Sequence, residues 1–252
     1  MCLILLAVDM HPDYPLILAA NRDEFYARPS RPLDWWPEDS RLLAGKDLES
    51  GGSWFGITRA GHLAAVTNYR EAGSNLPQRP SRGILVRNYL QQTAAGWENW
   101  LAFNAHTFNG FNLLYGTWNC LNWFSNRNGR PARLDTGIHG LCNSLLDTPW
   151  PKLERGKQLL RQNLTQQNFT PGDLLQTLRD NQPAADNRLP DTGIGQEWER
   201  RLSPIFIRSE TYGTRASTVL LVNKQQQVRI VERNWLPNGK YNDRQFEFDI
   251  DR

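Results

Sequence analysis

Two short apolar segments near the start of the chain limit its fold more than any other feature. Leu3–Val8 and Leu16–Ala20 are long enough for buried strands and too short for a membrane-spanning helix. The connector, residues 9–15, contains two aspartates and two prolines, which are residues that favour turns. The pattern predicts a β-hairpin buried in the core.

Cysteine is the second residue, directly before the first apolar segment. Initiator methionine is commonly removed before a small residue, and removal of Met1 would leave Cys2 with a free α-amine beside its thiol. An α-amine has a pKa of about 7.7–8.0, so it can take the thiol proton, as in N-terminal-nucleophile enzymes. The alternative is that Cys2 is a small buried residue of the first strand, as free cysteines often are.

The bulk properties favour a globular cytoplasmic protein. The 252 residues suit one large domain or two small ones, and we expect a single domain over residues 1–252. Three cysteines and no secretory leader indicate a reducing compartment. The net charge of only +3 predicts no nucleic-acid partner. The first apolar run ends at Asp9, so we expect no stable membrane insertion. The chain has no Cys/His spacing typical of a zinc site, so we expect no catalytic metal.

The order of expected elements is strands, then helices, then strands, which predicts an α+β fold. Helical spacing or an N-terminal proline predicts helices at residues 84–95, 97–103, 151–163 and 170–179. Apolar segments predict further strands at residues 51–57, 63–67, 111–115, 121–124, 132–134, 203–208, 217–223, 228–235 and 244–250. Prolines predict irregular structure from Arg28 to Asp39, and residues 181–196 are the best candidate for a mobile loop.

Polar residues at strand ends are the candidate site, because strand ends present functional groups from a rigid scaffold. Asp23 could orient an α-ammonium group, and Arg22 could bind a substrate carboxylate or lower the thiol pKa. Asn68 and Asn143 each carry an amide donor for an oxyanion, and Arg215 precedes a strand.

Each of these residues also has a structural interpretation. Arg22 and Asp23 could form an ion pair that holds the hairpin. The two asparagines, Asn68 and Asn143, could be turn formers, and Arg215 could be a surface charge.

The whole chain resembles the NRDE family, also called the transport and Golgi organisation protein 2 family. The resemblance rests on the N-terminal Met-Cys and on further motifs that occur in the same order along the chain, namely residues 16–26, 51–56, 65–70, 109–113, 143–152 and 212–215. It implies a four-layer αββα sandwich similar to N-terminal-nucleophile hydrolases.

The resemblance implies intracellular haem trafficking, with transient noncovalent binding of haem or another amphipathic small molecule and transfer to apo-haemoproteins. Asn21, Arg22, Arg70 and Arg215 are the candidate ligand-binding residues, and the guanidinium groups of the three arginines can pair with propionates. The chain has no Cys-x-x-Cys-His motif, so its four histidines, Cys2 and Met10 are the possible axial ligands.

Two alternatives remain open. One is a cysteine amidohydrolase that cleaves a non-peptide C–N bond, with Cys2 as nucleophile and Asp23, Asn68 and Asn143 as its supporting residues. Acylases of that kind place an arginine directly before the asparagine, where this chain has Ala20. The other alternative is an inactive hydrolase-like module that binds a protein, a lipid or an acyl-CoA.

Overall fold

The computed structural model describes residues 3–91, 96–166, 168–236 and 239–251. The chain forms two compact units. Unit 1 consists of Met1–Ala27, Asp135–Cys142 and Leu146–Asp249, and unit 2 consists of Arg28–Leu134, Asn143–Leu145 and Ile250–Arg252. Each unit has its own antiparallel sheet and its own hydrophobic core.

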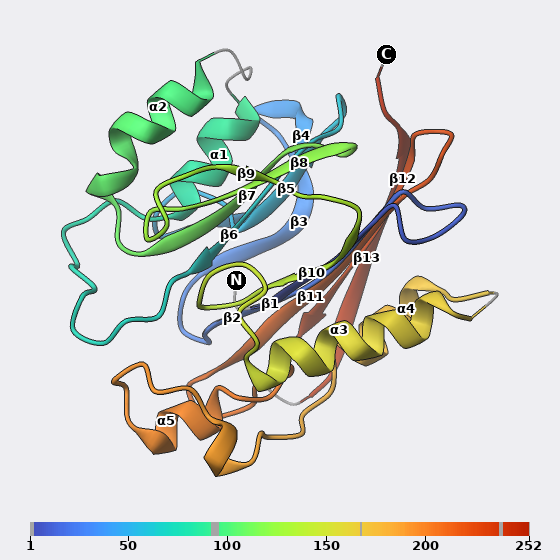
Figure 1. Cartoon of the computed structure of the whole chain (residues 1–252). Helices are drawn as coiled ribbons and strands as arrows, with labels where there is room; N and C mark the ends of the chain where they lie inside the picture. Colours follow the sequence, from blue (N-terminus) through green and yellow to red (C-terminus); the bar gives the residue numbers. More distant parts are fainter. Residues whose placement is uncertain (1–2, 92–95, 167, 237–238, 252) are drawn as a thin grey trace. The chain divides into compact units, whose positions relative to one another are not determined.

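The sheet of unit 1 has six strands in the order β10-β1-β2-β11-β12-β13 (Figure 1). Its strands are β1 (Leu3–Val8), β2 (Leu16–Phe25), β10 (Gly137–Leu141), β11 (Tyr212–Val222), β12 (Gln227–Trp235) and β13 (Tyr241–Asp249). The apolar residues of β1 and β2 are buried on both faces, as continuous apolar runs predict. The two strands form the expected hairpin, with Leu3 paired to Asn21.

Two helices of unit 1, α3 (Pro151–Leu164) and α4 (Pro171–Thr177), pack on one face of this sheet (Figure 1). Unit 1 also contains α5 (Gln196–Arg201) and a 3-10 turn η2 (Asp186–Arg188). A proline at the start of α3 and of α4 fixes the first turn of each helix. A β-carbon on Gly156 of α3 would lie 2.9 Å from the Leu5 side chain, so glycine permits the close approach of α3 to β1.

The sheet of unit 2 has seven strands that pair in their order along the chain, β3 to β9. They are β3 (Ser30–Trp36), β4 (Asp39–Asp47), β5 (Phe55–Thr58), β6 (His62–Asn68), β7 (Phe111–Thr117), β8 (Cys120–Ser125) and β9 (Ala132–Arg133). Helices α1 (Gly83–Gln91) and α2 (Trp97–Asn104) and the turn η1 (Ala105–Thr107) contribute to the same core.

Three local expectations were wrong. Residues 30–36 form a strand in spite of Pro32, because β3 lies at the sheet edge and its register shifts between Arg31 and Asp34. Residues 203–208 form an isolated bridge from Arg208 to Gly213 and no strand. The polar residues 21–24 lie inside β2 and not after its end.

The expected α+β class is confirmed, with two antiparallel sheets that each carry helices. Among the described residues, no helix has the length and apolar character needed to cross a membrane.

Candidate functional site

The Asn21 side chain is fully buried in unit 1, and both its nitrogen and its oxygen form hydrogen bonds. Its Nδ2 donates to the carbonyls of Leu178 and Ile205, each at 2.8 Å, and its Oδ1 accepts a hydrogen bond from Ser217 Oγ at 2.7 Å. Ser217 in turn accepts from the Trp235 indole at 3.0 Å. Asn21 therefore joins β2 to the end of α4, to the segment before β11 and to β11 itself.

Asp23 lies two residues further along β2 and is 4% exposed. Alternation along a strand places it on the same face as Asn21 and places Arg22, which is equally buried, on the opposite face. Thr214 Oγ1 donates to Asp23 Oδ1 at 2.6 Å and accepts from the Ile207 amide at 2.9 Å. The Asp23 carboxylate is thus fixed in position by β11.

Arg215 lies at a β-bulge of β11, where the register shifts between Thr214 and Ala216. Its Nη1 donates to the Phe25 carbonyl at 3.3 Å. Phe25 is 52% exposed, and its ring packs edge-on against Tyr212 at 5.1 Å. Burial lowers the pKa of the Arg215 guanidinium, although the charge of Glu24 opposes this shift. A partly desolvated cation therefore contacts the backbone of Phe25, a residue whose ring is exposed.

Asn68, Arg70 and Asn143 lie together in unit 2. Asn143 Nδ2 donates to the Asn68 carbonyl at 2.9 Å, and its Oδ1 accepts from Arg70 Nη2 at 3.2 Å. The Arg70 amide also donates to the Asn143 carbonyl at 2.7 Å. These bonds attach residues 143–145 to the end of β6.

A second asparagine of unit 2 supports this attachment. Asn112 Nδ2 donates to Thr67 Oγ1 at 3.1 Å and to the Ser144 carbonyl at 2.9 Å. Its Oδ1 accepts from the Trp123 indole at 3.3 Å. Asn112 is fully buried, so it holds both β6 and the segment 143–145 in place.

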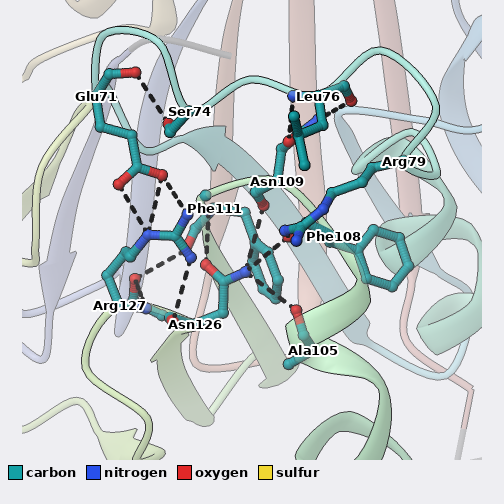
Figure 2. A network of polar contacts seen from close by, with 12 residues as sticks. Glu71, Ser74, Leu76, Arg79, Ala105, Phe108, Asn109, Phe111, Asn126 and Arg127 are labelled. Carbon is teal, nitrogen blue, oxygen red and sulfur yellow. Dashed lines mark hydrogen bonds and ion pairs between the residues drawn. The ribbon is translucent and has the colours of Figure 1, made fainter.

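Residues 69–82, which follow Asn68, form a loop that is tied to the rest of unit 2 (Figure 2). Arg127 Nε contacts both carboxylate oxygens of Glu71 at 3.0 Å. Asn109 exchanges two hydrogen bonds with the backbone of Leu76, each at 2.9 Å, and Arg79 Nη1 donates to the Phe108 carbonyl at 2.8 Å. The loop that carries Arg70 is therefore well anchored.

The structure brings the candidate residues together in two groups, Asn21, Arg22, Asp23 and Arg215 in unit 1 and Asn68, Arg70 and Asn143 in unit 2. Cys2 lies outside the described residues. Thr214 and Ser217 were not predicted as site residues. Their hydroxyls interrupt the apolar pattern of β11, and this was the available signal.

The histidines differ in their surroundings. His139 Nδ1 lies 2.9 Å from an Asp147 carboxylate oxygen, and its Nε2 lies 2.9 Å from the Asp135 carbonyl, so both ring nitrogens are engaged. His62 Nδ1 lies 3.4 Å from the Tyr89 hydroxyl, and His11 packs against Tyr14. In the described part of the chain, no group of three His, Cys, Asp or Glu side chains is arranged to hold a metal ion.

Comparison with known proteins gives a consistent result. The family model described as "Transport and Golgi organisation 2" matches residues 1–237. A mouse protein, "Transport and Golgi organization 2 homolog", is 36% identical in an alignment that covers 94% of this chain and 94% of the mouse chain. The human homologue is 34% identical over 99% of both chains.

Among solved structures, a Caenorhabditis elegans N-acylethanolamine-hydrolyzing acid amidase ortholog is similar. The similarity has a TM-score of 0.49 and 13% sequence identity over 87% of this chain and 92% of that chain.

Proposed function

The chain belongs to the transport and Golgi organisation 2 family, and we propose that it binds haem, or a similar amphipathic small molecule with carboxylate groups, noncovalently and releases it to an apo-haemoprotein. Haem is the cargo in this proposal and not a resident cofactor. The observation that carries the proposal is the arrangement of Arg215, Phe25 and Tyr212 in unit 1.

The chemistry of these three residues suits an amphipathic ligand. The exposed Phe25 ring, packed against the half-buried Tyr212, offers an apolar surface on which a planar ring can pack. The Arg215 guanidinium offers a charge-assisted hydrogen bond to a carboxylate. A cation that is already partly desolvated gives a stronger bond than one in bulk water, since the effective dielectric constant is lower.

Haem titration with purified protein tests the proposal. We expect a saturable Soret shift and transfer of haem to an apo-haemoprotein. Because a hydrogen bond to a charged group contributes about 1.5–3 kcal/mol, Arg215→Gln should weaken binding about tenfold or more, and Phe25→Ala should also weaken it. Arg229→Gln is the matched control, since Arg229 is exposed on β12 and paired with Glu247. A missing Soret shift, or equal affinity of Arg215→Gln and the wild type, would contradict the proposal.

A second candidate is amide hydrolysis with Cys2 as nucleophile. Cys2 is bonded to Leu3, which pairs with Asn21, and the buried Asp23 carboxylate follows on the same strand. In this proposal Asp23 orients the α-amine, which acts as the base that takes the thiol proton.

Intact-mass measurement of the protein from its native host tests this candidate first. Full retention of Met1 would exclude it, because the α-amine of Cys2 would then be acylated. If Met1 is absent, the wild type should hydrolyse an amide from a panel of N-acyl amides, and Cys2→Ala should not. Activity that survives in Cys2→Ala would exclude the same candidate.

A further inference from the structure

A groove in unit 1 has none of the candidate residues described above in its lining. It has a volume of about 550 Å³, which lies in the range of small-molecule sites. Its walls are one face of α3, the segment 182–188 and residues Ser203 and Ile205.

The lining of the groove is strongly basic. It contains five cations and one carboxylate, namely Lys152, Arg155, Lys157, Arg161, Arg188 and Glu154. Two of the cations are neutralised by neighbours, since Arg155 pairs with Asp180 at 2.8 Å and Lys157 pairs with Asp147 at 2.9 Å.

The remaining cations are not neutralised. Within the described ranges, Arg161 and Arg188 have no ion-pair partner. Lys152 is only 4% exposed, and its one acceptor among the described residues is the neutral carbonyl of Leu202 at 3.1 Å. An ammonium group has three hydrogens to donate. A bound anion in the groove would therefore provide the negative counter-charge and the further acceptors that the buried Lys152 lacks.

The opposite wall of the groove is held in place. The Ala184 amide donates to Ser203 Oγ at 3.0 Å, and Asp186 forms a two-bond ion pair with Arg200, at 2.7 Å and 2.6 Å. The carbonyl of Ile205, another lining residue, accepts one of the bonds from Asn21. The groove is therefore preformed, which lowers the entropic cost of binding a ligand.

We propose that this groove binds a small molecule that carries a diphosphate group. Lys152, Arg161 and Arg188 line the groove and have no ion-pair partner among the described residues, so a ligand with several negative charges suits it better than a single carboxylate does. Arginine also favours phosphate oxygens because it can donate two parallel bonds. This site is separate from the proposed haem-binding residues and does not depend on that proposal.

Calorimetric titration of the full chain with inorganic pyrophosphate at physiological salt tests the proposal, with inorganic phosphate and ADP as parallel probes. We expect saturable binding of pyrophosphate and ADP, and at least tenfold weaker binding of phosphate. The double variant Arg161→Gln/Arg188→Gln should weaken pyrophosphate binding at least tenfold. Both residues are exposed, so the fold should be retained, and circular dichroism checks it.

Arg201→Gln is the matched control, because Arg201 is an exposed arginine of α5 paired with Glu197 outside the groove. It should bind pyrophosphate like the wild type. Equal affinity of the double variant and the wild type would overturn the proposal, as would a lack of saturable binding. Binding to vesicles of phosphatidylcholine with phosphatidylglycerol is measured as well. If the protein bound these vesicles through Arg161 and Arg188 but did not bind pyrophosphate, the proposal would also be overturned, because the site would then bind a lipid surface.

Discussion

Asn21 combines complete burial with three hydrogen bonds to distant parts of unit 1. Replacement by alanine would leave two carbonyls and a hydroxyl without their partner. Since each unsatisfied buried group costs about 1–3 kcal/mol, we expect Asn21→Ala to lower the free energy of unfolding by about 3 kcal/mol or more in urea. Asn21→Asp should be worse, because a carboxylate would face two carbonyl oxygens.

Asn187→Ala is the matched control for this prediction. Asn187 is exposed in η2, so its replacement should change the free energy of unfolding by less than about 0.5 kcal/mol. An Asn21→Ala protein as stable as the wild type would show that these three bonds contribute nothing net to stability.

The sequence pointed to Asn21 as a ligand-binding residue, because it begins a run of polar residues after an apolar segment. Its partners could not be predicted, since Leu178 and Ile205 are 157 and 184 residues away. Asn143 was predicted as an oxyanion donor, and this stays a prediction. Its contact with Asn68 was not expected, because neither residue carries a local signal for a partner about 75 residues distant.

At the level of elements, the connection between β10 and α3 is built around an ion pair. Asp147 contacts His139 and Lys157, and it also exchanges bonds with the backbone of Gly140 at 2.8 Å and 2.9 Å. These contacts join Gly140 to Asp147, the residues on either side of the short segment that contains Asn143. The positive φ of Asp147, 55°, suits an aspartate in such a tight connection.

This ion pair predicts a pH dependence of stability. The hydrogen bond with Asp147 raises the pKa of His139 above its ordinary 6.5, against the opposing effect of burial. A raised pKa in the folded state means that the stabilisation is complete below about pH 6.5 and is lost as the pH rises through the raised value. We therefore expect the free energy of unfolding to fall between pH 6.5 and mildly alkaline pH, as measured by urea titration.

At low pH, protonation of Asp147 removes the contribution of the same ion pair to stability. Burial raises the pKa of its carboxyl, but hydrogen bonds from His139 and Lys157 outweigh this and lower it below 3.8. Its contribution is therefore present above about pH 3.8 and is lost as the pH falls through the lowered value. Asp147→Asn should abolish the alkaline loss assigned to His139, whereas His106→Gln, at an exposed position, should keep it. An unchanged profile in Asp147→Asn would refute the assignment.

Elements with a clear apolar pattern were predictable, including the first hairpin, the meander β7–β8–β9 and the helices that begin with proline. The edge strand β3 was missed because Pro32 argues against a strand, and only its position at the edge makes proline tolerable. Residues 203–208 have strand-like composition but are held by single contacts, such as the bond from Ile207 N to Thr214 Oγ1.

At the scale of the whole molecule, the two units differ in how far apart their paired strands lie along the chain. In unit 2 each strand pairs with the next one in sequence, from β3 to β9. In unit 1, β2 pairs with β11, and Ser217 bonds to Asn21 across 196 residues. The core of unit 1 thus needs both ends of the chain.

This difference predicts an order of folding. Closing a long loop costs entropy before any contact is gained, so strands close in sequence pair faster than distant ones. We expect amides of β5 and β6, which are joined by a short turn, to gain protection before the amides that bond β2 to β11 when the denatured chain refolds, as measured by pulsed hydrogen exchange with mass spectrometry. The local β1–β2 hairpin is an internal control, since its strands are adjacent in sequence and can form before β11 joins them. If the amides that bond β2 to β11 became protected as early as those of β5 and β6, sequence separation would not control the order of folding.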